Sequence, residues 1–326
     1  EVIATDVAGN TKTISFTLDR TAPEIEVKYS TTEPTNQGVF VNLISNEPIQ
    51  EIEGWRKISD TEYQKAYGFN YTQDVTVKDL AGNEKVVTIS VTNIDKTAPE
   101  IEVKYSTTEP TNHGVFVNLI SNEPIQEIAG WRKISDTEYQ KAYSSNYTQD
   151  VTVKDLAGNE KVVNISVTNI DKTAPEIEVK YSTTEPTKNG VFVNLISNEP
   201  IQEIAGWRKI SDTEYQKAYT SNYTQDVVVK DLVGNEKVVN ISVTNIDKTA
   251  PEIEVKYSTT EPTKNGVFVN LISNEPIQEI AGWRKISDTE YQKAYTSNYT
   301  QDVVVKDLVG NEKTVTITIT NINKAD

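Results

Sequence analysis

The chain has 326 residues, of which 48 are acidic and 32 basic, giving a net charge of −16. Such a polyanion repels nucleic acid and acidic membrane surfaces, and no apolar run approaches the about 20 residues of a membrane-spanning helix. There is no cysteine, so disulfides and thiolate chemistry are excluded. The chain also has no methionine and no signal peptide, which we interpret as a window from a longer protein.

An internal repeat organises the sequence. The motif Thr-Ala-Pro-Glu recurs at an interval of 76 residues (97 − 21), and the segments that it opens are nearly identical. Residues 1–20 match only the last two strands of a repeat, so we expect them to form the C-terminal hairpin of a preceding, truncated repeat. The sequence therefore predicts four domains at 21–96, 97–172, 173–248 and 249–324.

Alternating apolar and polar residues predict six to seven short strands in each repeat, and no segment has useful helical periodicity. Turn signals recur about every 8–12 residues, which is typical of a two-sheet antiparallel sandwich of the immunoglobulin type. The predicted fold class is all-β. In the first repeat we expect strands, in chain order, at 25–29, 39–43, 49–57, 63–67, 71–77 and 85–94.

Two short segments join these strands and repeats. Asp79–Asn83 has turn composition, with Gly82 and Asn83 suited to positive φ. Residues 95–99, which we call the hinge, are stiff because Pro99 fixes its own φ and favours extended geometry at Ala98. A short hinge without a Gly/Ser linker predicts an extended row of domains in which each contacts only its neighbours.

Several motifs together resemble the bacterial immunoglobulin-like (Big-type) repeats of large cell-surface proteins, especially Gram-positive adhesins. They are Asn46-Glu47-Pro48-Ile49, Gly54-Trp55, the Asp79–Asn83 turn and the Ile94–Pro99 hinge region. The resemblance covers every full repeat. It implies a stalk or adhesin that is exported, attached to the cell wall and displayed outside the cell. Its partners would be neighbouring repeats and a host or cell-surface ligand.

The sequence contains no catalytic constellation. The single histidine, His113, is replaced at equivalent positions by Gln37, Asn189 and Asn265, so a general base would exist in one repeat of four. A histidine-based triad cannot form in the other three repeats, and neither the nucleophile-elbow nor the phosphate-loop pattern occurs. We therefore expect no enzyme activity.

Each repeat has one tryptophan, Trp55 in the first, and two interpretations apply to it. The first makes it the core aromatic of the sandwich, and the second lets it stack on a sugar or another surface ligand. The Arg56-Lys57 pair that follows fits a strand leaving the core, which favours the first interpretation. Tyr63, Tyr67 and Tyr71 are expected to pack on the sheets.

Carboxylates at the turn and the hinge are the candidate metal ligands. Asp79 and Asn83 lie in the turn, and Asp95 lies in the hinge. Hard oxygen donors suit Ca²⁺, which takes six to eight oxygens, so the sequence predicts a calcium ion at the joint between domains. The alternative is that Asp79 caps its own turn and Asp95 is solvated. The candidate ligands are Asp79, Asn83, Asp95, Asp155, Asn159, Asp171, Asp231, Asn235 and Asp247.

The leading functional hypothesis is a non-enzymatic stalk, in which the repeats hold a binding tip away from the cell. A strand of seven residues rises about 23 Å at about 3.3 Å per residue, so with its turns each repeat extends roughly 35–40 Å. The alternative is a repetitive adhesive module, in which identical weak sites accumulate avidity. An aromatic or apolar patch exposed at the same place in every repeat would favour the adhesive alternative.

Overall fold

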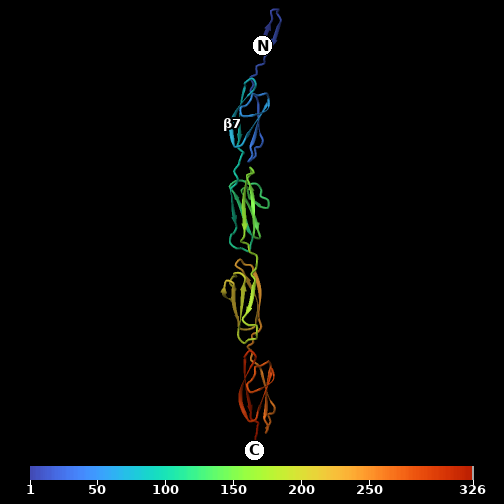
Figure 1. The fold of residues 1–326 in the computed structure, drawn as a ribbon, viewed down its shortest axis with the longest axis vertical. Helices are drawn as coiled ribbons and strands as arrows, with labels where there is room; N and C mark the ends of the chain where they lie inside the picture. Colours follow the sequence, from blue (N-terminus) through green and yellow to red (C-terminus); the bar gives the residue numbers. More distant parts are fainter. Residues whose placement is uncertain (325–326) are drawn as a thin grey trace. The chain divides into compact units, whose positions relative to one another are not determined.

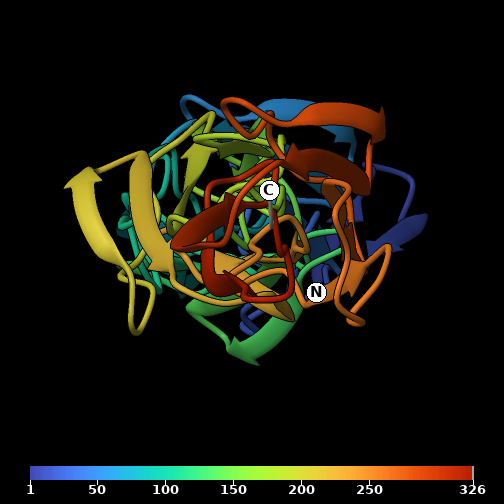
Figure 2. The same ribbon diagram turned by 90° about the horizontal axis from the view of Figure 1, so that it is seen from below.

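The computed structural model describes residues 1–324, which form β-strands and no helix, so no helix of this part of the chain could span a membrane (Figures 1 and 2). Contacts divide the chain into two units, Glu1–Asp171 and Lys172–Asp326, and each is described by itself. Figure 1 colours the repeats along the sequence and labels β7 in the first.

The first unit holds a hairpin and two repeats. In each repeat four strands form an antiparallel sheet and two form a second sheet, with orders β3-β4-β6-β5 and β7-β8 in the first repeat and β9-β10-β12-β11 and β13-β14 in the second. The strands are β1 (Val2–Thr5), β2 (Thr11–Ile14), β3 (Ile25–Tyr29), β4 (Val39–Ser45), β5 (Arg56–Ser59), β6 (Glu62–Tyr67), β7 (Tyr71–Lys78), β8 (Glu84–Val91), β9 (Ile101–Tyr105), β10 (Val115–Ser121), β11 (Arg132–Ser135), β12 (Glu138–Tyr143), β13 (Tyr147–Lys154) and β14 (Glu160–Val167).

The second unit repeats this arrangement twice, with sheet orders β15-β16-β18-β17 and β19-β20, then β21-β22-β24-β23 and β25-β26. Its strands are β15 (Ile177–Tyr181), β16 (Val191–Ser197), β17 (Arg208–Ser211), β18 (Glu214–Tyr219), β19 (Tyr223–Lys230), β20 (Glu236–Val243), β21 (Ile253–Tyr257), β22 (Val267–Ser273), β23 (Arg284–Ser287), β24 (Glu290–Tyr295), β25 (Tyr299–Lys306) and β26 (Glu312–Ile319).

The core of each repeat lies between its two sheets. Val41 and Leu43 of β4 are fully buried, and they form one apolar cluster with Val77 of β7 and Ile89 of β8. Side chains alternate across a strand, so every second residue of these strands faces the opposite sheet. The predicted all-β fold of tandem immunoglobulin-like sandwiches is therefore confirmed, with six strands in each repeat.

The strand expected at 49–57 is wrong. Ile49 forms a single antiparallel bridge with Asp79, and the chain then turns through Gly54, whose φ is +75°. The strand β5 begins only at Arg56. Pro48 has no N–H to give to a sheet, and a residue at φ +75° cannot continue an extended strand, so the pairing starts late. Positive φ in the 79–83 turn is likewise confined to Gly82, and Asn83 does not adopt it.

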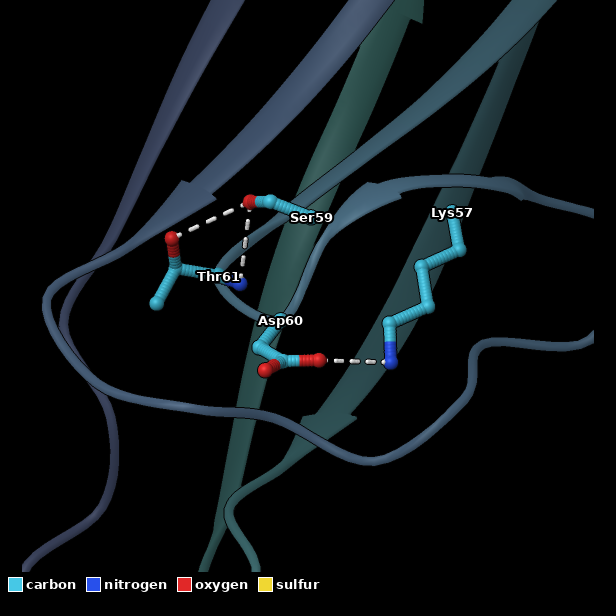
Figure 3. A network of polar contacts seen from close by, with 4 residues as sticks. All are labelled: Lys57, Ser59, Asp60 and Thr61. Carbon is cyan, nitrogen blue, oxygen red and sulfur yellow. Dashed lines mark hydrogen bonds and ion pairs between the residues drawn. The ribbon is translucent and has the colours of Figure 1, made fainter.

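A tight turn joins β5 to β6 (Figure 3). The Oγ of Ser59 accepts a hydrogen bond from the N–H of Thr61 at 3.2 Å, and Lys57 Nζ lies 2.8 Å from an Asp60 carboxylate oxygen. The pairing slips by one residue between Lys57 and Ser59, which marks a β-bulge. These polar contacts fix the turn at the edge of the larger sheet.

The aromatic residues divide between core and edge. Tyr63 is 1% exposed and Tyr67 is buried, whereas Trp55 packs against the core and stays partly exposed. Lys65 Nζ lies 5.9 Å from the Trp55 ring centre and 5.6 Å from that of Tyr67, so a cation sits between the two rings. Tyr71 is 47% exposed. The aromatic at the centre of the sandwich is thus Tyr63, and Trp55 closes its edge.

Residues 1–20 contain a two-stranded hairpin, as expected, but it is short. Its second strand ends at Ile14, so Phe16 and Leu18 lie beyond it. Val2, Ile3, Ile14, Phe16 and Leu18 are all exposed. A hairpin without a covering sheet has no core of its own.

Candidate metal centre

The Asp79–Asn83 turn holds a buried carboxylate. Asp79 is 1% exposed; its Oδ1 accepts from the N–H of Asn83 at 2.8 Å and its Oδ2 accepts from Asn83 Nδ2 at 2.6 Å. Burial pushes the pKa of Asp79 upward, but hydrogen bonds from the Asn83 side chain and then from the turn's N–H groups hold the pKa below its ordinary value. The aspartate therefore caps its own turn as an anion.

Asn159, the second repeat's counterpart of Asn83, connects the turn to the hinge before it. Its Nδ2 donates to Asp155 Oδ2 at 2.7 Å and to the main-chain oxygen of Asp95 at 3.1 Å. We call this pair of hydrogen bonds the latch. Asn311 makes the same bond to the main-chain oxygen of Asp247. Asn83 and Asn235 donate instead to the main-chain oxygens of Thr21 and Thr173, two residues beyond the hinge aspartate.

Three carboxylates meet beside the latch. One oxygen each of Asp95, Glu123 and Asp155 lies within 4.8 Å of the others. Equivalent trios are Asp19, Glu47 and Asp79 in the first unit and Asp247, Glu275 and Asp307 in the second. Each combines a buried turn aspartate, a hinge aspartate and a glutamate from the Asn-Glu-Pro loop.

The glutamate of each of these trios has a raised pKa. Burial, and then the charges of Asp155 and Asp95, raise the pKa of Glu123 above its ordinary value. The same causes raise the pKa of Glu47 and of Glu275. No ion pair within residues 1–324 includes any of these nine carboxylates. The nine are Asp19, Glu47, Asp79, Asp95, Glu123, Asp155, Asp247, Glu275 and Asp307.

This donor set fits a hard divalent cation. Three carboxylates can supply three to six oxygens, and Ca²⁺ takes six to eight oxygens from carboxylates, carbonyls and water. Asn159 points its amide nitrogen at Asp155 and at the hinge, so that nitrogen is a donor in the latch and only the amide oxygen remains as a ligand. The chemistry suits Ca²⁺ far better than a metal that prefers sulfur or imidazole.

The structure groups the expected ligands differently from the sequence analysis. Asp95 lies with Asp155 and Asn159 of the following repeat, and Asp247 lies beside the turn that follows it. Asp79 and Asn83, however, belong with Asp19 and not with Asp95. Asp79 precedes β8 and Asp95 follows it, and eight residues of strand separate them by about 26 Å.

The remaining expected ligands make hydrogen bonds within their own units. Asp231 Oδ2 accepts from Asn235 Nδ2 at 2.7 Å in the second unit, and the N–H of Asp171 donates to Thr111 O at 2.9 Å in the first. The ligands expected from the sequence did not include Asp19, Asp307 or the glutamates of the Asn-Glu-Pro loops. The length of β8 was the signal available, because eight residues of extended strand carry the hinge away from its own turn.

Comparisons with known proteins add little to this description. No protein-family model matches the chain. Among solved structures, the human desmocollin-1 ectodomain aligns with 99% of this chain and 84% of its own, at 13% identity and a TM-score of 0.29. A score this low carries no argument, so the fold assignment rests on the strands and cores above.

One similarity to a curated protein was found. The Enoyl-acyl-carrier-protein reductase (NADH) FabI of Buchnera aphidicola subsp. Acyrthosiphon pisum (strain APS) is 24% identical over 127 residues. These cover 38% of this chain and 49% of that protein, so the chain spans about half the length of this relative. At this identity and coverage the similarity does not place the chain in that family.

Proposed function

We propose that the chain is a non-enzymatic spacer of a bacterial cell-surface protein, outside the cell and attached to the wall, that holds a binding tip away from the surface. One observation carries the proposal. The hinge residue Asp95 is bonded on both sides: its N–H donates to Thr35 O of the first repeat at 3.0 Å, and its O accepts from Asn159 Nδ2 of the second. A hinge fixed to both neighbours resists bending.

The second unit has the same arrangement. The N–H of Asp247 donates to Thr187 O at 2.8 Å, and its main-chain oxygen accepts from Asn311 Nδ2 at 3.1 Å. A proline follows each hinge aspartate by four residues, which restricts the chain further. These contacts support the spacer function, because a spacer acts through its length and must resist bending.

Calcium is the second element of the proposal. Burial first, and then the charges of Asp155 and Asp95, raise the pKa of Glu123, and a Ca²⁺ ion held by these three carboxylates would offset the repulsion between them. Because Asp95 belongs to the hinge and the other two ligands to the second repeat, the ion would also join the hinge to that repeat. The joint would then be stiffer with calcium than without it.

Changing the number of repeats tests the spacer directly. Deleting residues 97–172 should shorten the maximum dimension, measured by small-angle scattering, by roughly 35–40 Å, and duplicating them should lengthen it equally. Because the repeats are nearly identical in sequence, the deletion and the duplication variants keep the same type of joint between neighbouring repeats. A maximum dimension that does not follow repeat number would contradict the spacer function.

A specific observation also favours the adhesive alternative. Phe40 of β4 is 49% exposed on the outer face of the larger sheet, and its counterparts Phe116, Phe192 and Phe268 are exposed to the same degree. In the fourth repeat a hollow of about 360 Å³ lies beside Phe268, Asn270 and Gln292. Replacing all four phenylalanines by serine should abolish binding to host cells if the repeats are adhesive, and should change nothing if they are a spacer.

A further inference from the structure

The four repeats differ at few positions, and one of them lies at the joints. Asn36, Asn112, Lys188 and Lys264 occupy equivalent places in the loop after the first strand of each repeat. We call this the loop position. In both units the structure sets it against the turn of the following repeat.

Across the joint within the first unit the contact is neutral. The main-chain N–H of Asn36 donates to Ala157 O at 3.1 Å. Asn36 Nδ2 also lies 3.6 Å from where a Cβ on Gly158 would stand. The same turn in the first repeat has no such loop against it, since nothing lies within 4 Å of the Cβ position at Gly82.

Across the joint within the second unit the contact is charged. Lys188 Nζ donates to Gly310 O at 2.8 Å and lies 3.2 Å from the Cβ position of that glycine. The pKa of Glu312 is held below its ordinary value by its bond to Lys306, then by the charge of Lys306 and more weakly by that of Lys188. The ammonium group therefore donates to a carbonyl and acts weakly, through its charge, on an anionic neighbour.

We propose that the residue at the loop position sets how each joint responds to ionic strength. The joint made by Lys188 loosens as salt rises, and the joint made by Asn36 does not. The physical reason is screening, because the Debye length falls from about 30 Å at 0.01 M to about 3 Å at 1 M. A hydrogen bond between two neutral main-chain groups has no comparable dependence.

The absence of cysteine makes the test practical in the full chain. Spin labels placed by Thr76→Cys and Thr152→Cys span the joint within the first unit. Labels placed by Val228→Cys and Val304→Cys span the joint within the second unit. All four sites are exposed on their strands. Electron–electron distance distributions are recorded at low and high salt, with chelator present so that bound cations do not contribute.

Both joints contain a carboxylate trio whose repulsion salt also screens, so the comparison is between the two joints. The expected result is a distribution that broadens with salt between positions 228 and 304 and does not broaden between 76 and 152. Lys188→Gln should give the broad distribution already at low salt, whereas Lys188→Arg should keep the salt response. Asn36→Lys should confer that response on the first joint. An equal response of both joints, or no effect of Lys188→Gln, would overturn the proposal. The distribution widths test the contact separately from the spacer function, which depends on overall length.

Discussion

The side-chain amide of Asn159 donates to the main-chain oxygen of Asp95 at 3.1 Å, and so ties the turn of one repeat to the hinge of the repeat before it. The same amide nitrogen donates to the buried carboxylate of Asp155. One side chain thus caps a turn and fixes a hinge. This accounts for a joint that is ordered by the protein alone, to which calcium would add.

Removing the latch should destabilise the repeat that contains it. Asn159→Ala leaves the buried Asp155 without a side-chain donor, and hydrogen bonds to charged groups contribute about 1.5–3 kcal/mol. We expect a loss of that size in the free energy of opening of β13 and β14, measured by hydrogen exchange. Asn164→Ala is the matched control, because Asn164 bonds the exposed Asp150 and should cost far less. Equal losses for the two variants would contradict the latch.

The glutamate of the trio should respond to calcium and to pH. In chelator at neutral pH, Glu123→Gln should raise the melting temperature, because it removes one of three crowded charges. With calcium, the same variant should bind one ion fewer by titration calorimetry. A site filled at a hundred times its dissociation constant stabilises the folded state by about 2.7 kcal/mol. Glu127→Gln removes an exposed charge nearby and serves as the control; an identical effect of both variants would count against the site.

The pH dependence has opposite signs for the two kinds of carboxylate. The raised pKa of Glu123 contributes stability below the unfolded value of about 4.3, and this is lost as pH rises through the folded pKa. The lowered pKa of Asp79 contributes stability above about 3.9, and this is lost as pH falls through its folded pKa. In chelator, the stability difference between Glu123→Gln and the natural chain should therefore grow from acid toward neutral pH. Thermal melts at several pH values check this.

The buried tyrosines allow a paired substitution. The hydroxyl of Tyr139 is buried without a hydrogen-bond partner, whereas that of Tyr143 accepts from Gln149 Nε2 at 2.6 Å. An unsatisfied buried group costs about 1–3 kcal/mol, so Tyr139→Phe should be neutral or stabilising. Tyr143→Phe should cost about 1 kcal/mol through its lost hydrogen bond. Chemical denaturation measures both, and a large loss for Tyr139→Phe would show that its hydroxyl is satisfied in solution.

The N-terminal hairpin should exchange its amides rapidly. Every residue of β1 and β2 is exposed, and a two-stranded hairpin is marginal in water. Amides of Ala4 and Thr13 should exchange orders of magnitude faster than those of Val117 and Leu119 in the core of the second repeat. Protection of the hairpin in a dilute monomer would contradict this expectation.

The fold was predictable because strand alternation is a local property. Val39, Val41 and Leu43 repeat with period two, and the structure buries all three against the second sheet. The prediction for segment 49–57 failed because Pro48 and Gly54 prevent pairing, and because its apolar residues Ile52 and Trp55 are three residues apart and do not follow the two-residue period of a strand. Tyr63 and Trp55 could not be ranked by burial, since their exposure depends on where the smaller sheet ends.

The site was less predictable, because its residues come from different repeats. Asp79 and Asp95 are close in sequence and lie at opposite ends of β8, whereas Asp95 and Asp155 are 60 residues apart and lie together. In a tandem array a composition-based search assigns ligands to the wrong copy unless the direction of each strand is followed. The contact of Asn36 with Ala157 could not be predicted for the same reason, because the sequence does not show which loop lies against the following repeat.

The central claim, that hinges bonded on both sides make this chain a spacer, is tested most directly by its radius of gyration in dilute solution. The proposed spacer requires four repeats of roughly 35–40 Å in a row, which would give a length of about 150 Å, and a thin rod of that length would have a radius of gyration of about 43 Å. A single compact globule of this chain length would have about 20 Å. Small-angle scattering should give a value near the first figure, and a value near the second would contradict the account.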